Sequence, residues 1–387
     1  MHLFFSVGEP SGDQHAAHLL QELRRRRPDL EVSGYGGPLM EQAGCRLQYR
    51  LTELAVMGIL PVLPLLGRFY QLVRRARRFF QESRPDAVIL VDFPGFNWWI
   101  ARQARAAGIP VFYYFPPQLW AWASWRVRRL RKYVDHVLCA LPFEKAWYAQ
   151  RGVEVEYVGH PIFDEVARQE LDPAFARDWA EGEGARVGLL PGSRNREVTQ
   201  NWPVMLEVVR RLHAQNPGAR FLVACYKEAH RRWCQEQLPP ADRRLPLHLF
   251  VGKTPEIIAL ADCCLMVSGS VSLEVLARAT PAAVLYRASR LVNVVARRLI
   301  SCKYLSLPNL MADRDLLPEF YCIGNPEPDI QKMTALLHSW LTNPASRARA
   351  RKDLAELRQQ VAQPGAIAHT AEAILKRLEP AEADRAA

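Results

Sequence analysis

Two short segments of small residues give the clearest indication of chemistry in this sequence. Pro-Gly-Ser-Arg at 191–194 follows the apolar run 186–190, and Ser-Gly-Ser at 268–270 follows the apolar run 263–267. A turn between a strand and a helix presents free backbone N–H groups at the positive end of the helix dipole, which favours an anion. Arg194 adds donors suited to phosphate. Two such turns predict a diphosphate site, although glycine and serine also occur in ordinary strand–helix turns.

The first half of the chain offers an acid in a comparable position. Asp92 follows the apolar run 87–91, and a carboxylate there is costly to desolvate unless it is paired or takes part in a reaction. It could accept the proton of an attacking hydroxyl. The alternative is an Asx turn or a helix cap. Because Pro94 and Gly95 already supply the turn, the sequence favours the catalytic interpretation.

Two further loops follow predicted strands: 8–13, which opens the first helix, and the aromatic segment 113–122. Ligands of doubly wound sheets bind beyond the carboxyl ends of the strands, and aromatic rings there suit sugars or acyl chains. The competing interpretations are helix capping by Ser11 and Asp13 and packing of the aromatic rings in the core. Asn97, from the loop that contains Asp92, is a further candidate. The candidate substrate residues are therefore Glu9, Ser11, Gly12, Asp13, Asn97, Trp120 and Trp122.

Short strands alternate with helices through two successive halves of the chain. Strands that are apolar throughout, such as 87–91 and 263–267, indicate parallel sheets covered on both faces. We therefore expect an α/β protein with two doubly wound, Rossmann-like domains facing a cleft. The expected limits are 1–160 and 161–344, with helices at about 345–380 returning to the first domain.

The amino-acid composition indicates which kinds of partner the protein could bind. The 387 residues carry a net charge of +11, which indicates an acidic partner such as nucleic acid, anionic lipid or a phosphorylated substrate. No zinc-finger or RRM pattern favours nucleic acid. The eight cysteines show no metal-ligand spacing, so we expect buried thiols in a reducing cytoplasm. We find no signal-peptide pattern and no apolar run long enough to span a bilayer.

The segment 56–66 is apolar and is followed by several arginines. An apolar surface bordered by arginine fits an element that lies in the membrane surface beside anionic headgroups. Pro61 and Pro64 prevent one straight helix. The alternative is a core helix with a solvated basic end. The expected membrane patch comprises Met57, Ile59, Leu60, Leu63, Leu66, Arg68, Arg74, Arg75 and Arg78.

With these residues in view, the chain resembles lipid A disaccharide synthases, inverting glycosyltransferases of the GT-B type (glycosyltransferase family 19), over nearly its whole length. Each matching motif alone is weak to moderate evidence for the family, whereas the order and spacing of the motifs together are specific to it. The motifs lie at 8–13, 36–40, 53–58, 92–97, 120–122, 141–144, 158–161, 190–194, 268–274 and 306–310.

The resemblance implies a reaction and a set of roles. UDP-2,3-diacylglucosamine would donate its sugar, with inversion, to the 6-hydroxyl of 2,3-diacylglucosamine 1-phosphate (lipid X), giving UDP and a β-1,6 disaccharide 1-phosphate. Asp92 would be the base, and no metal or other cofactor is expected because arginine and a helix N-terminus stabilise UDP. The resemblance also implies peripheral contact with the anionic inner membrane surface from the cytoplasm and allows a homodimer. The implied donor-binding residues are Gly192, Ser193, Arg194, Ser268, Gly269, Ser270, Glu274 and Asn309.

The chain departs from the family pattern at four positions. Gly95 replaces a second acid, Ala123 an arginine and Cys322 a glutamine, and Ser270 replaces a threonine, which keeps the hydroxyl. Two other interpretations stay open: another UDP-sugar transferase or epimerase of the same fold, and a nucleotide-binding scaffold without catalysis. An epimerase of non-acylated sugars would not need the apolar, basic patch, and the presence of Asp92 and Arg194 favours an active enzyme.

Overall fold

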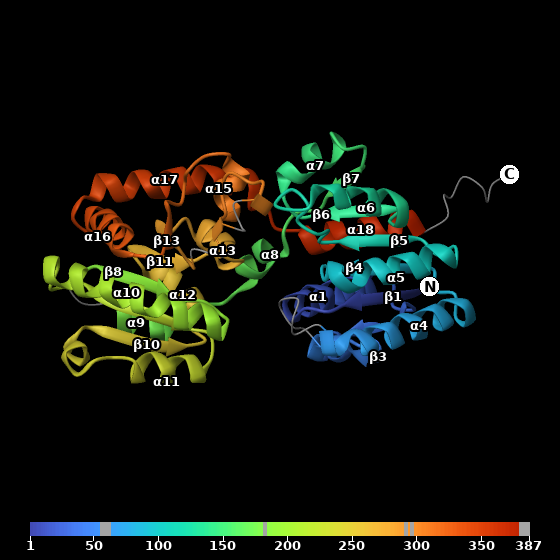
Figure 1. The fold of residues 1–387 in the computed structure, drawn as a ribbon, viewed down its shortest axis with the longest axis horizontal. Coiled ribbons are helices and arrows are strands. Elements are labelled where there is room, and N and C mark those ends of the chain that lie inside the picture. The colour runs from blue at the N-terminus through green and yellow to red at the C-terminus, as the bar shows by residue number, and fades with distance from the viewer. Residues whose placement is uncertain (55–62, 181–183, 290–292, 295–297, 379–387) are drawn as a thin grey trace. The chain divides into compact units, whose positions relative to one another are not determined.

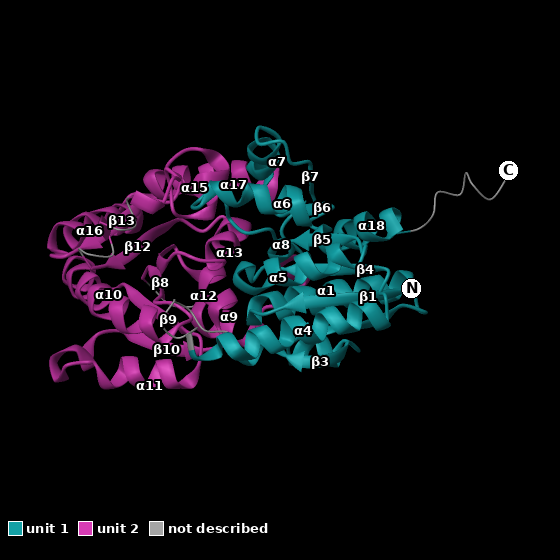
Figure 2. Ribbon diagram, turned by 45° about the vertical axis from the view of Figure 1, so that its right-hand side comes forward, with its two compact units in different colours: residues 1–164, 364–387 teal, residues 165–363 magenta. Residues whose placement is uncertain are grey.

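The computed structural model describes residues 1–54, 63–180, 184–289, 293–294 and 298–378. The chain forms two compact units (Figure 1 and Figure 2): unit 1 comprises Met1–Asp164 and Pro364–Ala387, and unit 2 comprises Glu165–Gln363. Within the described residues each unit has a parallel β-sheet with helices on both faces. The α/β class and the two doubly wound sheets expected from the sequence are confirmed.

The sheet of unit 1 has seven strands in the order β3-β2-β1-β4-β5-β6-β7. β1 and β4 are neighbours, but the chain leaves them in opposite directions, from β1 to β2 and from β4 to β5. Because every pairing is parallel, the carboxyl ends of these strands lie at one edge. The strands are β1 His2–Val7, β2 Glu31–Gly36, β3 Arg46–Arg50, β4 Ala87–Val91, β5 Val111–Tyr114, β6 His136–Cys139 and β7 Val155–Tyr157.

Alternating side chains of β1 divide the core of unit 1 in two. Leu3 and Phe5 pack with residues of α1 (Pro10–Arg26) and α18 (Ala366–Leu378) on one face. Phe4 packs on the other face with residues of three other helices of unit 1. Those helices are α4 Leu66–Glu82, α5 Pro94–Ala106 and α6 Val127–Tyr133; the shorter elements are α2 Pro38–Gln42, η1 Leu51–Leu54, η2 Leu63–Leu65, η3 Ser124–Arg126, α7 Pro142–Ala149 and α8 Pro161–Arg168.

The sheet of unit 2 has six strands in the order β10-β9-β8-β11-β12-β13, all paired in parallel. The strands are β8 Arg186–Leu190, β9 Arg220–Cys225, β10 Leu247–Val251, β11 Cys263–Val267, β12 Ala282–Ala288 and β13 Glu319–Ile323. The helices are α9 Pro173–Ala180, α10 Asn195–Gln215, α11 Glu228–Glu236, η4 Pro240–Arg244, α12 Thr254–Leu260, α13 Val271–Arg278, α15 Leu307–Ala312, α16 Glu327–Thr342 and α17 Pro344–Val361.

The C-terminal helices are divided between the units. α17 packs on α13 and α16 in unit 2, whereas α18 packs on α1 in unit 1. The expected return of the whole segment 345–380 to the first domain is therefore wrong for α17, and unit 2 extends past residue 344. Asp164 holds the returning chain, because its buried carboxylate accepts hydrogen bonds from the backbone N–H of Gly365 and, at 2.9 Å, of Ile367.

Three elements differ from what the sequence predicts. The sequence predicts a helix over 203–213, but α10 begins at Asn195 and Pro203 lies inside it. The edge strands β3 and β13 were not anticipated: β3 is partly polar and not buried, and β13, although its last four residues are apolar or aromatic, has only one buried residue. The earlier start of α10 places its N-terminus directly after Arg194.

Candidate active site

Asp92 lies at the carboxyl edge of the unit 1 sheet, where the connections from β1 and β4 diverge. Such a switch point is where ligands bind in doubly wound sheets. The loops that follow the two strands pack closely together: a Cβ atom added to Gly8 would lie 2.1 Å from the Phe93 ring. Any residue larger than glycine at position 8 would therefore displace the ring beside Asp92.

The backbone of Asp92 is held in an unusual conformation. Asp92 and Phe93 have φ values of 45° and 47°, in the left-handed region that non-glycine residues rarely adopt. The carbonyl of Asp92 accepts hydrogen bonds from Asn97 Nδ2 at 2.7 Å and from the Tyr113 hydroxyl at 2.9 Å. Strain of this kind persists only where the surroundings hold it, and it concentrates at functional sites.

Asn97 connects the ends of the two central strands. Its Oδ1 accepts a hydrogen bond from Ser6 Oγ at 2.7 Å, and its Nδ2 also donates to the Ser6 carbonyl at 3.1 Å. Asn97 is fully buried. It was predicted as a substrate residue, but the structure places its amide in contact with the backbone that carries Asp92, so its role here is positioning.

The Asp92 side chain is half-buried. Burial raises its pKa above the ordinary aspartate value, while a hydrogen bond from the Phe93 backbone and the nearby His15 act in the opposite direction. His15 stacks on Phe115 at 5.1 Å between ring centroids, and His160 meets the same ring edge-on at 5.2 Å. A raised pKa makes the carboxylate a stronger base than a solvated aspartate.

None of these three residues was named individually as a candidate from the sequence. Phe115 follows β5 within the aromatic segment 113–122, and His160 lies in the motif 158–161 at the expected domain boundary. His15 lies in α1, about one turn after Gly12. A histidine in the first turns of a helix that opens at a strand end was the available signal.

The predicted substrate loop 8–13 is partly structural. The buried carboxylate of Asp13 accepts hydrogen bonds from the backbone N–H groups of Gly37, Leu39 and Met40 at 2.9, 3.0 and 3.2 Å, so it caps α2. Ser11 is exposed, Glu9 is half-buried at the N-cap of α1, and Gly12 is buried. Of the predicted substrate residues in this loop, therefore, Glu9 and Ser11 have side chains accessible to a ligand, whereas Gly12 and Asp13 are buried.

The two tryptophans of the aromatic loop differ in environment. Trp120 is buried, and its Nε1 donates a 3.0 Å hydrogen bond to Glu144, whose pKa burial raises to about 7. Trp122 is exposed, and the Arg126 guanidinium lies over its ring at 4.6 Å. Of the two, Trp122 is the one available to a substrate.

In unit 2, Arg194 is the N-cap of α10. Its guanidinium is 59% exposed and pairs with Glu197 at 2.7 Å. The same carboxylate accepts hydrogen bonds from the backbone N–H groups of Ser193 and Arg194 at 3.1 and 3.2 Å. Gly192 has a φ of +125°, and a Cβ atom there would lie 2.6 Å from Glu197 Cβ. An anionic side chain therefore already occupies the predicted anion site.

Glu197 was not predicted as a site residue. A glutamate three residues after the N-cap is the pattern of a capping box, and this was the available sequence signal. The donors that Glu197 engages are those that a phosphate would use at a helix N-terminus.

The second small-residue turn lies at the start of α13. Ser268 is half-buried, and Gly269 and Ser270 are exposed, with Ser270 at the N-cap. Glu274, one turn into α13, is near Arg278 at 3.5 Å, and burial raises its pKa. A carboxylate at this depth can accept hydrogen bonds from hydroxyl groups of a ligand.

Asn309, which was expected to bind the donor, is fully buried in α15. Its Oδ1 accepts hydrogen bonds from the backbone N–H groups of Leu316 and Leu317 at 2.9 and 2.8 Å, and its Nδ2 donates to Glu319 at 3.1 Å. The structure therefore gives Asn309 a role in holding the loop between α15 and β13. Within the described ranges no group of three His, Cys, Asp or Glu side chains could hold a metal ion.

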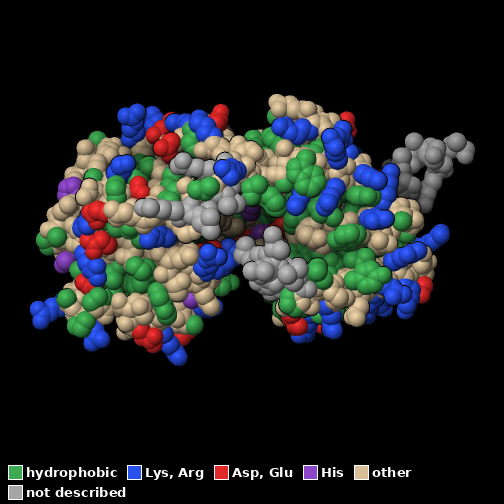
Figure 3. Space-filling model, in the orientation of Figure 1, with side chains coloured by type: hydrophobic (Ala, Val, Ile, Leu, Met, Phe, Trp, Pro, Cys, Tyr) green, Lys and Arg blue, Asp and Glu red, His purple; other side chains and the backbone are tan. Residues whose placement is uncertain are grey.

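The expected membrane patch is described only in part. Met57, Ile59 and Leu60 lie outside the described residues, and Leu63 begins η2. Leu66, Arg68, Arg74, Arg75 and Arg78 are all exposed on α4. Figure 3 shows hydrophobic and basic side chains together on the visible face of unit 1. No helix within the described part of the chain is long and apolar enough to cross a membrane.

Apart from Ser270, the departures from the family pattern have separate environments. Gly95 is exposed in the first turn of α5. Ala123 has a φ of 56° at the start of η3, three residues before Arg126. Cys322 is fully buried in β13 and contributes to the core of unit 2.

The fold belongs to the GT-B class of glycosyltransferases and related sugar-nucleotide enzymes. The solved structure of UDP-GlcNAc 2-epimerase from Neisseria meningitidis, bound to UDP-GlcNAc, aligns with a TM-score of 0.64 at 12% identity, covering 97% of this chain and 100% of that one. MurG of Acinetobacter baumannii aligns with a TM-score of 0.56 at 15% identity over 97% and 99% of the two chains. At these identities the likeness establishes the fold alone.

The particular family follows from sequence. The family model described as lipid-A-disaccharide synthetase matches residues 3–376. A lipid-A-disaccharide synthase of Myxococcus xanthus is 35% identical over 97% of each chain, and that of Azotobacter vinelandii is 41% identical over 81% of this chain and 83% of its own. The chain belongs to the lipid-A-disaccharide synthetase family and is a glycosyltransferase of lipid A biosynthesis.

Proposed function

We propose that this enzyme transfers 2,3-diacylglucosamine from UDP-2,3-diacylglucosamine to the 6-hydroxyl of lipid X, releasing UDP and forming a β-1,6-linked disaccharide 1-phosphate. Family membership supports the reaction class. The observation that carries the chemistry is the Asp92 carboxyl, which lies at the switch point of the unit 1 sheet on a backbone held by Asn97 and Tyr113.

In the proposed mechanism Asp92 acts as general base. Its carboxylate accepts the proton of the acceptor 6-hydroxyl while that oxygen bonds to the anomeric carbon of the donor. The bond from the anomeric carbon to the diphosphate breaks in the same displacement, the bonding electrons leave with UDP, and the anomeric configuration inverts. The raised pKa of Asp92 supports this role, because a stronger base takes the proton more readily.

Arg194 and the two helix N-termini of unit 2 stabilise the departing diphosphate in this proposal. Charge that develops on a leaving group is stabilised best by donors that are already oriented. The Arg194 guanidinium and the backbone N–H groups of Ser193 and Arg194 are such donors, and Glu197 engages all three. The donor diphosphate would take the place of the Glu197 carboxylate. Gly269, Ser270 and Glu274 would contact the remainder of the nucleotide.

The acylated substrates require access to a membrane. Exposed Leu66 and the arginines of α4 support peripheral contact with an anionic inner membrane surface on the cytoplasmic side. A homodimer is compatible with the family and belongs to the proposal. Trp122, with Glu9 and Ser11, would line the acceptor side, since their side chains are accessible.

The test is a two-substrate assay with purified protein. UDP-2,3-diacylglucosamine and radiolabelled lipid X are expected to give a labelled disaccharide 1-phosphate and one UDP per product, whereas UDP-N-acetylglucosamine is expected to give neither product nor epimer. Turnover of the non-acylated nucleotide, or UDP binding without any product from the acylated pair, would contradict the proposal. NMR of the product anomeric proton tests inversion.

A further inference from the structure

A cavity of about 400 Å³ lies between β3 and α4, away from the Asp92 site. Its lining comes from the first three residues of β3 and from the second half of α4. The short loop after α4 leads into the amino end of β4, so the cavity is near the amino ends of the strands, whereas Asp92 follows the carboxyl end of β4. The lining residues are Arg46, Leu47, Gln48, Arg75, Arg78, Phe79 and Glu82.

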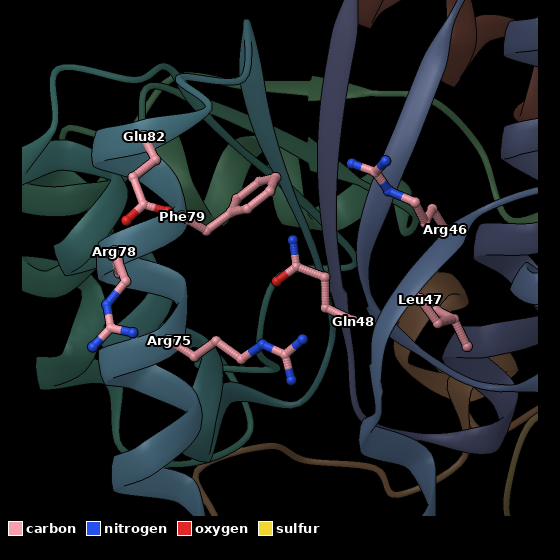
Figure 4. Close-up of a pocket in the computed structure, with 7 residues that line it drawn as sticks. All are labelled: Arg46, Leu47, Gln48, Arg75, Arg78, Phe79 and Glu82. Atoms are coloured by element: carbon pink, nitrogen blue, oxygen red, sulfur yellow. The ribbon is translucent and has the colours of Figure 1, made fainter.

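The cavity is predominantly basic. Figure 4 shows the Arg46 and Arg75 guanidinium groups extending into the space between β3 and α4, with the Gln48 amide between them and the Phe79 ring facing the same space. None of Arg46, Arg75 and Arg78 forms an ion pair with a described residue. Three cations therefore share one cavity with a single carboxylate, Glu82, and their repulsion would be relieved by a bound anion.

These groups suit a phosphate with an apolar substituent. Two guanidinium groups offer paired donors of the kind that bind phosphate, and the Gln48 amide adds a further donor. The Phe79 ring gives one wall of the cavity an apolar character. A divalent cation or a nucleobase would find no carboxylate pair and no stacked ring pair here.

We propose that the β3–α4 cavity binds the phosphate of an anionic phospholipid headgroup. The inference rests on the membrane contact in the proposed function and adds the site that selects anionic lipid. It is independent of the transfer chemistry, because the cavity lies at the edge of the sheet opposite Asp92.

The placement along α4 favours a lipid over a free anion. α4 spans 17 residues, which corresponds to about 25 Å. Its beginning carries Leu66 and Tyr70, which are 53% and 65% exposed, and its second half lines the cavity. Exposed apolar and aromatic side chains suit the membrane interface. A bilayer surface lying along α4 would contact both regions, whereas a free phosphate would use the cavity alone.

The principal experiment compares vesicle binding of two double variants. Arg46→Gln with Arg75→Gln empties the cavity of its inward-pointing charges, and Arg349→Gln with Arg351→Gln removes the same charge from exposed positions on α17. We expect the cavity variant to bind phosphatidylcholine vesicles containing phosphatidylglycerol at least about tenfold more weakly than the unchanged protein. The α17 variant should stay within about twofold, and so should turnover of both variants with detergent-dispersed substrates.

A single substitution provides an independent readout. Gln48→Glu puts a carboxylate between the two guanidinium groups, where it would pair with them internally. We expect this variant to have a higher melting temperature than the unchanged protein and weaker binding to the anionic vesicles. If the cavity did not bind lipid, this variant would have the higher melting temperature but unchanged binding to the anionic vesicles.

Three outcomes would overturn the inference. Equal loss of vesicle binding in the cavity and α17 variants would show that overall charge alone directs the protein to the membrane. Unchanged binding in the cavity variant would remove the site. Micromolar binding of inorganic phosphate that depends on Arg46 and Arg75, with unaltered vesicle binding, would make the ligand a free anion. Because turnover is measured in detergent, none of these outcomes affects the proposed transfer reaction.

Discussion

The strand-end sites of the two units are built in opposite ways. In unit 1 the proposed reactive group is the Asp92 carboxyl, whose pKa burial raises, and neutral hydrogen bonds from Asn97 and Tyr113 hold its backbone. In unit 2 the proposed phosphate-binding group is the Arg194 guanidinium, which is paired with Glu197 and belongs to a side chain that is 59% exposed. In this proposal the acid is set in place before any ligand binds, whereas the cation would exchange one anionic partner for another.

This difference fits the demands of the two proposed roles. A general base needs a defined position and a raised pKa, and both come from burial and fixed backbone. A phosphate site needs donors that remain oriented without an unpaired positive charge, and an internal carboxylate provides this until the ligand displaces it. Substitutions at the two sites should therefore have different effects. A substitution of Asp92 should lower turnover, and a substitution of Arg194 should lower nucleotide affinity.

The largest effect is expected for Asp92→Asn. Because an amide cannot accept the proton, turnover should fall by about 10³-fold or more, while affinity for UDP stays within about twofold. Asp86→Asn, an exposed position just before the amino end of the same strand, should leave turnover unchanged. Steady-state kinetics and calorimetric titration with UDP measure the two quantities. Near-normal turnover of Asp92→Asn would exclude Asp92 as the base.

Arg194→Ala should act on the nucleotide. Loss of a charged hydrogen-bonding group costs about 1.5–3 kcal/mol, so we expect UDP affinity to fall by roughly 10- to 100-fold and turnover at saturating donor to fall less. Arg196→Ala removes another exposed arginine two residues further on, within α10, and serves as the matched control. If both variants bind UDP equally well, the cation site does not involve Arg194.

Asn97→Ala tests the positioning of Asp92. The Ser6 hydroxyl would lose its acceptor and the Asp92 carbonyl one donor, which should lower the free energy of unfolding by about 2 kcal/mol and turnover by about tenfold. A purely structural loss would leave the pH profile unchanged. We expect instead that the acidic limb of the kcat profile moves to lower pH, because a looser loop exposes the carboxyl and lowers the pKa that burial had raised. Ser6→Ala, which removes one bond, should show a smaller shift of the same sign.

The smallest effect concerns stability as a function of pH. Burial raises the pKa of Glu144 from 4.5 to about 7, so the folded protein holds this proton more tightly than the unfolded chain. The resulting stabilisation is fully present below about pH 4.5 and is lost as the pH rises through about 7. Melting temperatures of the unchanged protein should therefore fall more steeply between pH 5 and pH 8 than those of Glu144→Gln. Parallel curves would contradict the assignment.

Much of the fold could be predicted from the sequence, which also indicated the main candidate site residues. Fully apolar strands such as β4 and β11 predicted parallel sheets covered on both faces. Because parallel strands end at one edge, the residues that follow them, Asp92 and Arg194, were predicted as reactive groups without knowledge of the tertiary structure. The order of residues along the chain was sufficient for these predictions.

Only the tertiary structure decided what each candidate side chain contacts. Asp13, Asn97 and Asn309 are of residue types that often bind ligands. Their polar side-chain atoms nevertheless form hydrogen bonds with backbone groups that are far away in the sequence or across a loop. The pairing of Arg194 with Glu197 and the cavity between β3 and α4 likewise depend on distances in space. A sequence pattern specifies which donors and acceptors a segment carries, but folding determines which of them are already satisfied when a ligand arrives.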